Sequence, residues 1–229
     1  MSFTTPPVIT VDGPSGAGKS ALCKALARYL GWYFLDSGKF YRILAFIALQ
    51  YKVDYMSEKE LVSLSSYLNI FSLAHSNQLQ VLFRGKDLSY KIKTELIGRT
   101  ASQVATFPCV REALLYHQRA ARKFPGLIAD GRDMGTIVFP DASVKIFLYA
   151  SPQERARRRL FQLQKNGFSV NLQFVSDALK KRDNCDYNRA LAPLIPAQDV
   201  LMLDSTYISL EEVIIKALAY AKHRLLLVI

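Results

Sequence analysis

One short segment near the start of the chain combines the residue types that hold a phosphate chain. Residues 13–20 fit the pattern GxxxxGK[ST]. In this pattern the glycines let backbone N–H groups turn inward, the lysine neutralises the outer phosphates and the last hydroxyl binds Mg²⁺. The segment therefore predicts a bound nucleoside triphosphate. The residues expected to hold it are Gly13, Pro14, Ser15, Gly16, Ala17, Gly18, Lys19, Ser20 and Ala21.

The arginines are the second group of residues suited to chemistry. The chain of 229 residues has 30 Lys and Arg against 19 Asp and Glu, which gives a net charge of +11. Its partner is therefore expected to be an anion: nucleic acid, anionic lipid or a phosphorylated small molecule. The sequence has no long basic tail, and several arginines stand beside glycines, aspartates or turns. This arrangement favours a cleft over a basic stripe.

The elements around residues 13–20 have the order that a phosphate-binding loop requires. Residues 8–11 form a short β-branched run that is typical of a buried strand. Apolar residues then recur with helical spacing over 22–30, and Gly31 predicts the end of that helix. A second strand is predicted at 32–35 and a helix from there through Leu49. Strand, glycine loop and helix in this order support triphosphate binding.

The sequence changes in character between residues 52 and 107, where short strand patterns alternate with helical ones. We interpret this stretch as an inserted lobe; the alternative is an irregular stretch of the main domain. The predicted elements are a helix from Ser57, with Glu60 completing a capping box, through Tyr67, strands at 70–73 and 79–83 joined around residues 76–77, and a helix over 109–123.

The second half of the chain returns to an alternation of strands and helices. Strands are predicted at 127–129, 144–149 and 200–203, and helices begin at the capping patterns of Ser151 and Ser209. Arg155, Arg158 and Arg159 share one face of the helix after Ser151, where like charges repel. A lid that closes over a polyphosphate explains this cluster; a solvated basic face is the alternative.

Several separate motifs, in matching order, resemble the bacterial cytidylate kinase family. They are the phosphate loop, DSGKFYR at 36–42, ASQVA at 101–105 before VRE at 110–112, GRD at 131–133 and RDNCDYNR at 182–189. The resemblance extends from Val8 to about Thr206. It implies an α/β fold in a single domain over 1–229, with a parallel five-stranded sheet flanked by helices. Within that domain it implies a monophosphate-binding lobe at about 52–107 and a short lid at about 154–170.

The same resemblance implies the reaction. ATP, with Mg²⁺, would transfer its γ-phosphoryl group to CMP or dCMP, giving ADP and the diphosphate, as a step of pyrimidine nucleotide metabolism in the cytoplasm. In such a transfer the protein positions two anions in line and spreads positive charge over the moving group. This explains the arginines better than a binding module does.

The resemblance also assigns roles residue by residue. The residues implied to act on the transferred group are Lys19, Arg132, Arg182, Arg189, Arg158 and Arg159. Those implied to bind the acceptor are Ser37, Tyr41, Arg42, Ser102, Arg111, Arg132, Asp133, Arg182, Asp186 and Arg189. Asp133 would accept from the cytosine amine, while Arg111 and Ser102 would donate to the ring. The phosphate loop itself implies that Ser20 binds Mg²⁺. Asp130, at the end of an apolar strand, would act on the ion through water; the alternative is an aspartate that only forms the turn before Gly131.

Four residues depart from the family pattern. Ala21 lacks the hydroxyl usual at its position, which Ser20 compensates. Cys109 replaces a basic residue, and Lys39 and Phe40 replace smaller or aliphatic ones. None is one of the arginines assigned to the phosphates, so we expect activity with an altered acceptor preference.

Two other readings remain open at this point: a P-loop kinase for another small acceptor, and a nucleic-acid-binding NTPase. The sequence shows no signal segment and no apolar run of about 20 residues, so we expect a cytoplasmic protein without a membrane partner. The three cysteines lie far apart, which predicts neither a disulfide framework nor a zinc site. We expect a monomer without a stable nucleic-acid partner.

Overall fold

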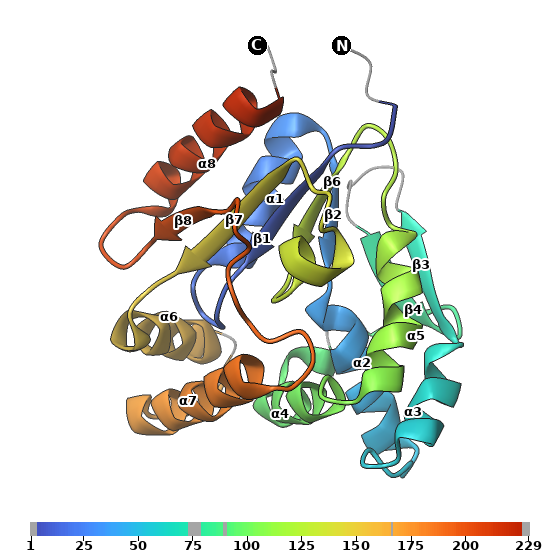
Figure 1. The fold of residues 1–229 in the computed structure, drawn as a ribbon. Coiled ribbons are helices and arrows are strands. Elements are labelled where there is room, and N and C mark those ends of the chain that lie inside the picture. Colours follow the sequence, from blue (N-terminus) through green and yellow to red (C-terminus); the bar gives the residue numbers. More distant parts are fainter. Residues whose placement is uncertain (1–3, 73–78, 89–90, 166, 226–229) are drawn as a thin grey trace.

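The central layer of the molecule is a parallel sheet with the strand order β2-β6-β1-β7-β8, covered by helices on both faces (Figure 1). The computed structural model describes residues 4–72, 79–88, 91–165 and 167–225. The predicted α/β fold with five parallel strands is confirmed. The strands are β1 (Val8–Asp12), β2 (Tyr33–Asp36), β6 (Leu127–Asp130), β7 (Val144–Tyr149) and β8 (Leu201–Asp204).

Alternate residues of the central strands face two different hydrophobic clusters. Val8 packs into the cluster beneath α2 (Gly38–Gln50), whereas Ile9 packs into the cluster beneath α1 (Lys19–Leu30) and α8 (Leu210–Leu225). A strand buried on both faces needs a continuous apolar sequence, which explains the composition of β1. The helices thereby fix the sheet from both sides.

The register of the sheet brings three acidic strand ends together. Asp130 is opposite both Val11 of β1 and Asp36 of β2, and Asp12 follows Val11 at the same edge. Because parallel strands end at one edge of the sheet, ligands of such folds bind there. The loop after β1 starts from this edge.

The segment between α2 and β6 carries a second sheet, antiparallel and three-stranded, with the order β3-β4-β5. Its elements are α3 (Glu58–Ser65), β3 (Leu68–Ser72), β4 (Leu79–Phe83), β5 (Lys86–Asp87), η1 (Lys91–Lys93), α4 (Glu95–Val104) and α5 (Pro108–Arg119). In Figure 1 these elements lie together to one side of the main sheet. The predicted turn at residues 76–77 lies outside the described residues.

Three predictions in this segment are wrong in detail. Helix α3 ends at Ser65, two residues before the predicted Tyr67, because the chain extends into β3 at Leu68, whose side chain is buried. The capping box between Ser57 and Glu60 does not form. The backbone N–H of Ser57 donates to the Asp54 carbonyl and not to the Glu60 side chain. Helix α5 ends at Arg119, whereas the pattern predicted a helix to residue 123.

The last third of the chain contains α6 (Pro152–Lys165) and α7 (Leu172–Asn188), which pack on each other through Ala156, Leu163, Val175 and Leu179. Helix α6 starts as predicted, with the Glu154 N–H donating to the Ser151 hydroxyl at 3.3 Å. The sequence analysis did not predict α7. Asn171 caps it by accepting from the Phe174 N–H at 2.8 Å.

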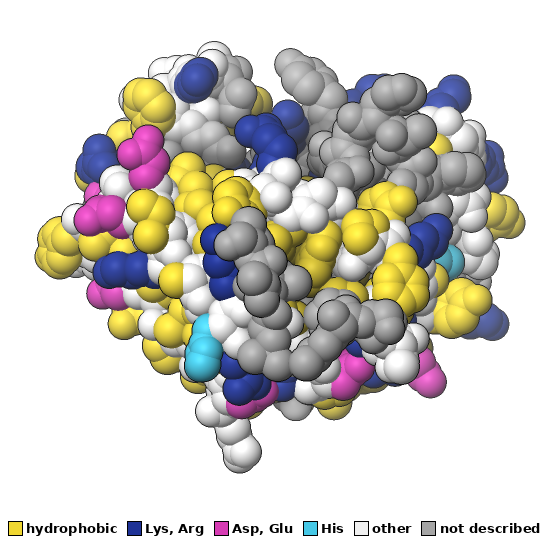
Figure 2. All heavy atoms as spheres, turned by 90° about the horizontal axis from the view of Figure 1, so that it is seen from above, with side chains coloured by type: hydrophobic (Ala, Val, Ile, Leu, Met, Phe, Trp, Pro, Cys, Tyr) yellow, Lys and Arg dark blue, Asp and Glu magenta, His cyan; other side chains and the backbone are white. Residues whose placement is uncertain are grey.

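The end of the molecule that carries both chain ends lies away from the phosphate loop (Figure 1). Figure 2 shows this end, where basic, acidic and hydrophobic side chains are interspersed. Helix α8 begins after β8 with the predicted capping box, since Ser209 and Glu212 exchange hydrogen bonds of 2.8 and 3.2 Å, and it ends near the C-terminus (Figure 1). Among the residues that the model describes, no helix is long and apolar enough to cross a bilayer.

Candidate active site

A cavity of 440 Å³ opens at the edge where β1, β2 and β6 end. It brings together nearly all the residues that the sequence analysis selected; only Gly13, Pro14 and Ala17 of that set are not among its lining residues. Four carboxylates line it, together with eight cationic side chains: Lys19, Arg42, Arg111, Arg132, Arg158, Arg159, Arg182 and Arg189. The excess of positive charge suits an anionic ligand.

The phosphate loop curls as its glycines permit. Gly13, Gly16 and Gly18 all have positive φ angles, of 141°, 82° and 98°, which side-chain-bearing residues rarely adopt. A Cβ atom at Gly13 would also overlap the Leu148 carbonyl, so the loop lies directly against β7. Pro14 and Ala17 take part through their carbonyl groups, which accept from side chains described below.

Lys19 is held inside this loop. Its side chain is buried, and Nζ donates to the Pro14 carbonyl at 2.9 Å. Burial, together with the neighbouring Arg132, lowers the pKa of Lys19 from 10.5 to about 8. A phosphate chain bound in the loop would place negative charge beside this ammonium group and would stabilise its protonated form.

The candidate Mg²⁺ ligands meet where α1 begins. The Ser20 hydroxyl donates to Asp130 Oδ2, although 110 residues separate the two in sequence. Burial raises the pKa of Asp130, and the charge of Lys19 opposes that rise. A hydroxyl and a carboxylate beside a phosphate site are the oxygen ligands that Mg²⁺ prefers, so these residues fit the ion.

Asp12 positions the turn that follows β6. Its carboxylate accepts from the backbone N–H groups of Met134 and Gly135 at 2.9 and 2.8 Å, and burial raises its pKa to about 7. These bonds hold the start of η2 (Met134–Val138), directly after Arg132 and Asp133. The sequence analysis did not identify this role; a buried aspartate at a strand end was the available signal.

One end of the cavity contains a preformed group of polar residues. Arg111 forms an ion pair with Asp133, and its guanidinium lies 5.7 Å from the centre of the Tyr41 ring. Arg189 Nη2 lies 3.8 Å from the second oxygen of Asp133. The Ser102 hydroxyl donates to the Gly98 carbonyl at 3.2 Å within α4. The cavity therefore joins α2, α4, α5 and the turn after β6.

The middle of the cavity holds positive charge that the protein only partly neutralises. Arg132 Nε donates to Asp186 at 2.6 Å; burial would raise the pKa of Asp186, but Arg132 and Arg182 hold it below its usual value. Burial, followed by the charges of Arg132 and Arg42, lowers the pKa of Arg182 to about 9. The buried atoms Nε of Arg182 and Nη2 of Arg189 have no hydrogen-bond partner among the described residues. Such groups indicate a site built for an anion.

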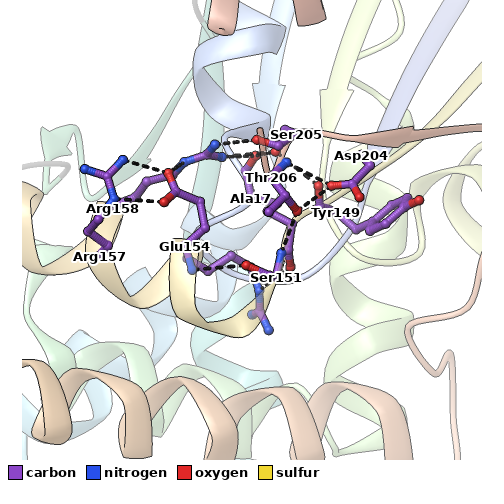
Figure 3. Close-up of polar contacts among 11 residues, drawn as sticks. Ala17, Tyr149, Ser151, Glu154, Arg157, Arg158, Asp204, Ser205 and Thr206 are labelled. Atoms are coloured by element: carbon purple, nitrogen blue, oxygen red, sulfur yellow. Dashed lines mark hydrogen bonds and ion pairs between the residues drawn. The ribbon is translucent and has the colours of Figure 1, made fainter. Parts of the chain in front are cut away.

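Arg158 ties α6 to the phosphate loop and to the end of β8 (Figure 3). Its guanidinium donates to the Ser205 hydroxyl at 3.0 Å, the Ser205 carbonyl at 2.5 Å and the Ala17 carbonyl at 3.3 Å. Glu154 accepts from both Arg157 and Arg158 at 2.8 Å. The sequence analysis missed Ser205, because no motif marks a serine that acts through backbone neighbours.

Each of the three arginines that share a face of α6 has an acidic partner. Arg155 pairs with Asp183 of α7 at 2.7 Å, Arg158 pairs with Glu154, and Arg159 pairs with Glu95 of α4. Their mutual repulsion is therefore relieved within the protein. Arg155 is buried and also donates to the Ser15 carbonyl at 3.1 Å, so it links α6 to the loop.

Helix α7 explains how the motif at 182–189 reaches the cavity. Arg182 and Asp186 are four residues apart and therefore share one helix face. Arg189 follows directly, at the end of the helix. The capping residue Asn171 and the spacing of Val175 and Leu179 were the signals that could have predicted this helix.

Comparison with known proteins agrees with this geometry. The family model for cytidylate kinase matches residues 9–223. The chain is 61% identical to a cytidylate kinase of Proteus mirabilis over 94% of this chain and 96% of that one, and 60% identical to a cytidylate kinase of Serratia proteamaculans over 95% of each. An uncharacterised protein from Eubacterium ventriosum shares the fold alone: its TM-score is 0.52 at 12% identity, over 95% of this chain and 98% of that one. The chain belongs to the cytidylate kinase family.

Proposed function

We propose that the protein transfers the γ-phosphoryl group of ATP to CMP or dCMP and releases ADP and CDP or dCDP. Family membership and relatives at about 60% identity that carry the name cytidylate kinase support this proposal. The observation that carries it is the cavity with eight cationic side chains, in which two buried guanidinium atoms lack hydrogen-bond partners within the described part of the chain. Two phosphorylated substrates would supply the missing acceptors.

The donor end of the site is the phosphate loop. Lys19, already placed inside the loop, would contact the outer phosphates of ATP while backbone N–H groups surround the chain. Ser20 would bind Mg²⁺, with Asp130 holding its water ligands. Bound there, the ion bridges phosphate oxygens and neutralises charge during transfer.

The arginines bring the two anions together. Two like charges about 4 Å apart repel by about 1 kcal/mol in water and by several times more in a partly dry cleft. We assign Arg42, Arg132, Arg182 and Arg189 to the acceptor phosphate and the moving group. Arg158 and Arg159 approach from α6. Guanidinium groups fixed before binding need little rearrangement during the reaction.

The polar group at the far end of the cavity suits cytosine. Asp133 would accept from the exocyclic amine, and Arg111, which already pairs with Asp133, would donate to the carbonyl oxygen O2 or to ring N3. Ser102 and Tyr41 line the same end, and Ser37 and Asp186 complete the acceptor set. Uracil offers a carbonyl where cytosine has an amine, which places two hydrogen-bond acceptors against each other at Asp133.

We also propose the division of labour within the single domain. Residues 52–107 form the acceptor lobe, because Ser102 from this segment lines the cavity. Residues 154–170 form the lid, which carries Arg158 and Arg159. The lid would exclude water from the transfer. We assign the reaction to pyrimidine nucleotide metabolism in the cytoplasm, and the active unit to the monomer.

The experiment that tests this proposal follows the phosphoryl group itself. Purified protein is mixed with ATP, Mg²⁺ and CMP, and the products are followed by ³¹P NMR. We expect ADP and CDP in equal amounts. The variant Lys19→Ala should abolish transfer while leaving CMP binding almost unchanged, because it removes a contact to ATP alone. Release of inorganic phosphate without CDP would contradict the proposal.

A further inference from the structure

A second cavity adjoins the active site. Its volume is 690 Å³, within the usual range for small-molecule sites. Its walls come from α1, β2, α2, η1 and α6, with Phe168 beyond the end of α6. The two cavities are continuous at five shared lining residues: Ser20, Asp36, Arg42, Arg159 and Gln162.

The lining of this cavity is strongly cationic. Among its described lining residues, Asp36 is the one carboxylate, against six cations: Lys24, Lys39, Arg42, Lys91, Lys93 and Arg159. The ammonium groups of Lys24, Lys39 and Lys91 form no hydrogen bond or ion pair with any described residue. They come from three separate elements, so no local pattern accounts for their convergence.

Three unpaired ammonium groups around one space repel each other unless an anion is present. A ligand with several negative charges a few ångströms apart matches such a spread of cations better than a single charge does. Arg42 also donates to the carbonyl of Ile92 at 2.8 Å, which ties the active-site arginine to the η1 wall of the second cavity. A ligand that displaces η1 would therefore also displace the Arg42 side chain.

We propose that this second cavity binds a polyphosphate chain, and that an anion held there inhibits transfer by drawing Arg42 and Arg159 away from the acceptor phosphate. The binding part stands on the cavity alone, whereas the inhibitory part rests on the proposed function. Lys39 departs from the family pattern and lines this cavity rather than the active site. Lys39 would thus serve as an anion ligand in the second cavity.

Binding is tested by calorimetry with inorganic tripolyphosphate. The protein is first saturated with Mg²⁺ and a non-hydrolysable ATP analogue, so that the phosphate loop is filled. The double variant Lys39→Glu with Lys91→Glu should weaken binding of tripolyphosphate about tenfold or more. The control double variant Lys86→Glu with Lys123→Glu makes the same change in net charge at exposed lysines outside both cavities, and should bind like the wild type.

An equal loss of tripolyphosphate affinity in the two double variants, or no loss in either, would contradict the proposal that this cavity is the binding site. The neutral pair Lys39→Gln with Lys91→Gln should give an intermediate loss, which keeps the test valid if the charge reversal unfolds the protein. GTP is tested in parallel. Tighter binding of GTP than of tripolyphosphate assigns the cavity to a nucleotide, whose base would lie against Phe46 and Phe168, and weaker binding assigns it to inorganic polyphosphate.

Inhibition is tested separately, at saturating ATP and constant free Mg²⁺. Tripolyphosphate should raise the apparent KM for CMP, and the Lys39 and Lys91 double variant should need about tenfold more of it for the same effect. Without tripolyphosphate, that variant should keep the wild-type KM for CMP within about twofold. Normal inhibition in a variant that has lost binding would refute the inhibitory role and leave the proposed transfer intact.

Discussion

A buried lysine in a phosphate loop is costly to charge until its ligand arrives. Lys19 shows this directly, because burial lowers its pKa to about 8 in the ligand-free protein. Phosphate charges favour the protonated form, so the pKa must rise when ATP binds. Below pH 8 the Lys19 side chain is already protonated, so ATP binding is accompanied by little proton uptake. Above pH 8 the side chain is mostly neutral, so it must take up a proton when ATP binds.

We therefore predict that ATP affinity falls as the pH rises above 8, toward about tenfold per pH unit. Calorimetry in two buffers of different ionisation enthalpy, between pH 7 and 9.5, measures both the affinity and the proton uptake. The variant Lys19→Ala should lack the proton uptake assigned to this group. Equal proton uptake in that variant would show that another group is responsible.

Asp133 is the residue whose loss should separate the two substrates. It holds Arg111 and lies beside Arg189, so Asp133→Ala removes both a base contact and the group that orients two guanidiniums. We predict that KM for CMP rises about 100-fold while KM for ATP changes little. The control Asp141→Ala removes an exposed aspartate, paired with Arg122, and should leave both values unchanged. Equal losses for ATP and CMP would argue against base recognition by Asp133.

The two capping patterns show what a local sequence can and cannot predict about an element. Ser209 and Glu212 form the predicted box, whereas Ser57 and Glu60 do not, although the residue types and spacing are the same. The difference lies in the chain before Ser57, which turns so that the Asp54 carbonyl accepts the Ser57 N–H. A pattern of four residues contains no information about that turn.

We therefore predict that alanine substitutions of the two serines change the free energy of unfolding by different amounts. Ser209→Ala should lower the free energy of unfolding by about 1 kcal/mol, because the Glu212 N–H loses its acceptor. Ser57→Ala should lower it by less than about 0.5 kcal/mol, because that side chain makes no capping bond. Urea unfolding at pH 7 measures both. A larger loss for Ser57→Ala would contradict the assignment of caps.

The attachment of α6 to its surroundings depends on Arg155. This side chain is buried and joins Asp183, the Ala150 carbonyl and the Ser15 carbonyl, whereas Arg157 on the same helix is 73% exposed. Arg155→Ala removes a buried cation and leaves the Asp183 carboxylate, which is 14% exposed, without its partner; it should lower the free energy of unfolding by about 3 kcal/mol. Arg157→Ala should change it by less than about 1 kcal/mol. Urea unfolding compares the two, and similar losses would show that the buried pair contributes little.

For the molecule as a whole, the sequence predicted the class of fold and the identity of the lining residues better than their contacts. The runs at β1, β6 and β7 predicted a buried parallel sheet because each run is mostly apolar. The predicted site residues converge because the sheet register aligns the ends of β1, β2 and β6. That register depends on helices far away in sequence, and it also decides that Asp12 holds the turn after β6.

The pairing of charges was beyond local prediction for the same reason. The partners of Arg132, Arg155 and Arg159 lie 54, 28 and 64 residues away in sequence, on different elements. Like-charge spacing along α6 therefore predicted a repulsion that tertiary contacts relieve. The folded structure is needed to show which cationic side chains are paired within the protein and which are available to bind a ligand.

The central claim is that this cationic cavity joins ATP to a cytosine monophosphate. The most direct test measures ADP release with CMP, dCMP, UMP and AMP as acceptors, at saturating ATP and Mg²⁺. We predict that kcat/KM for CMP or dCMP exceeds the values for UMP and AMP by about 100-fold or more. A preference for UMP or AMP, or ADP release that does not depend on an acceptor, would contradict it.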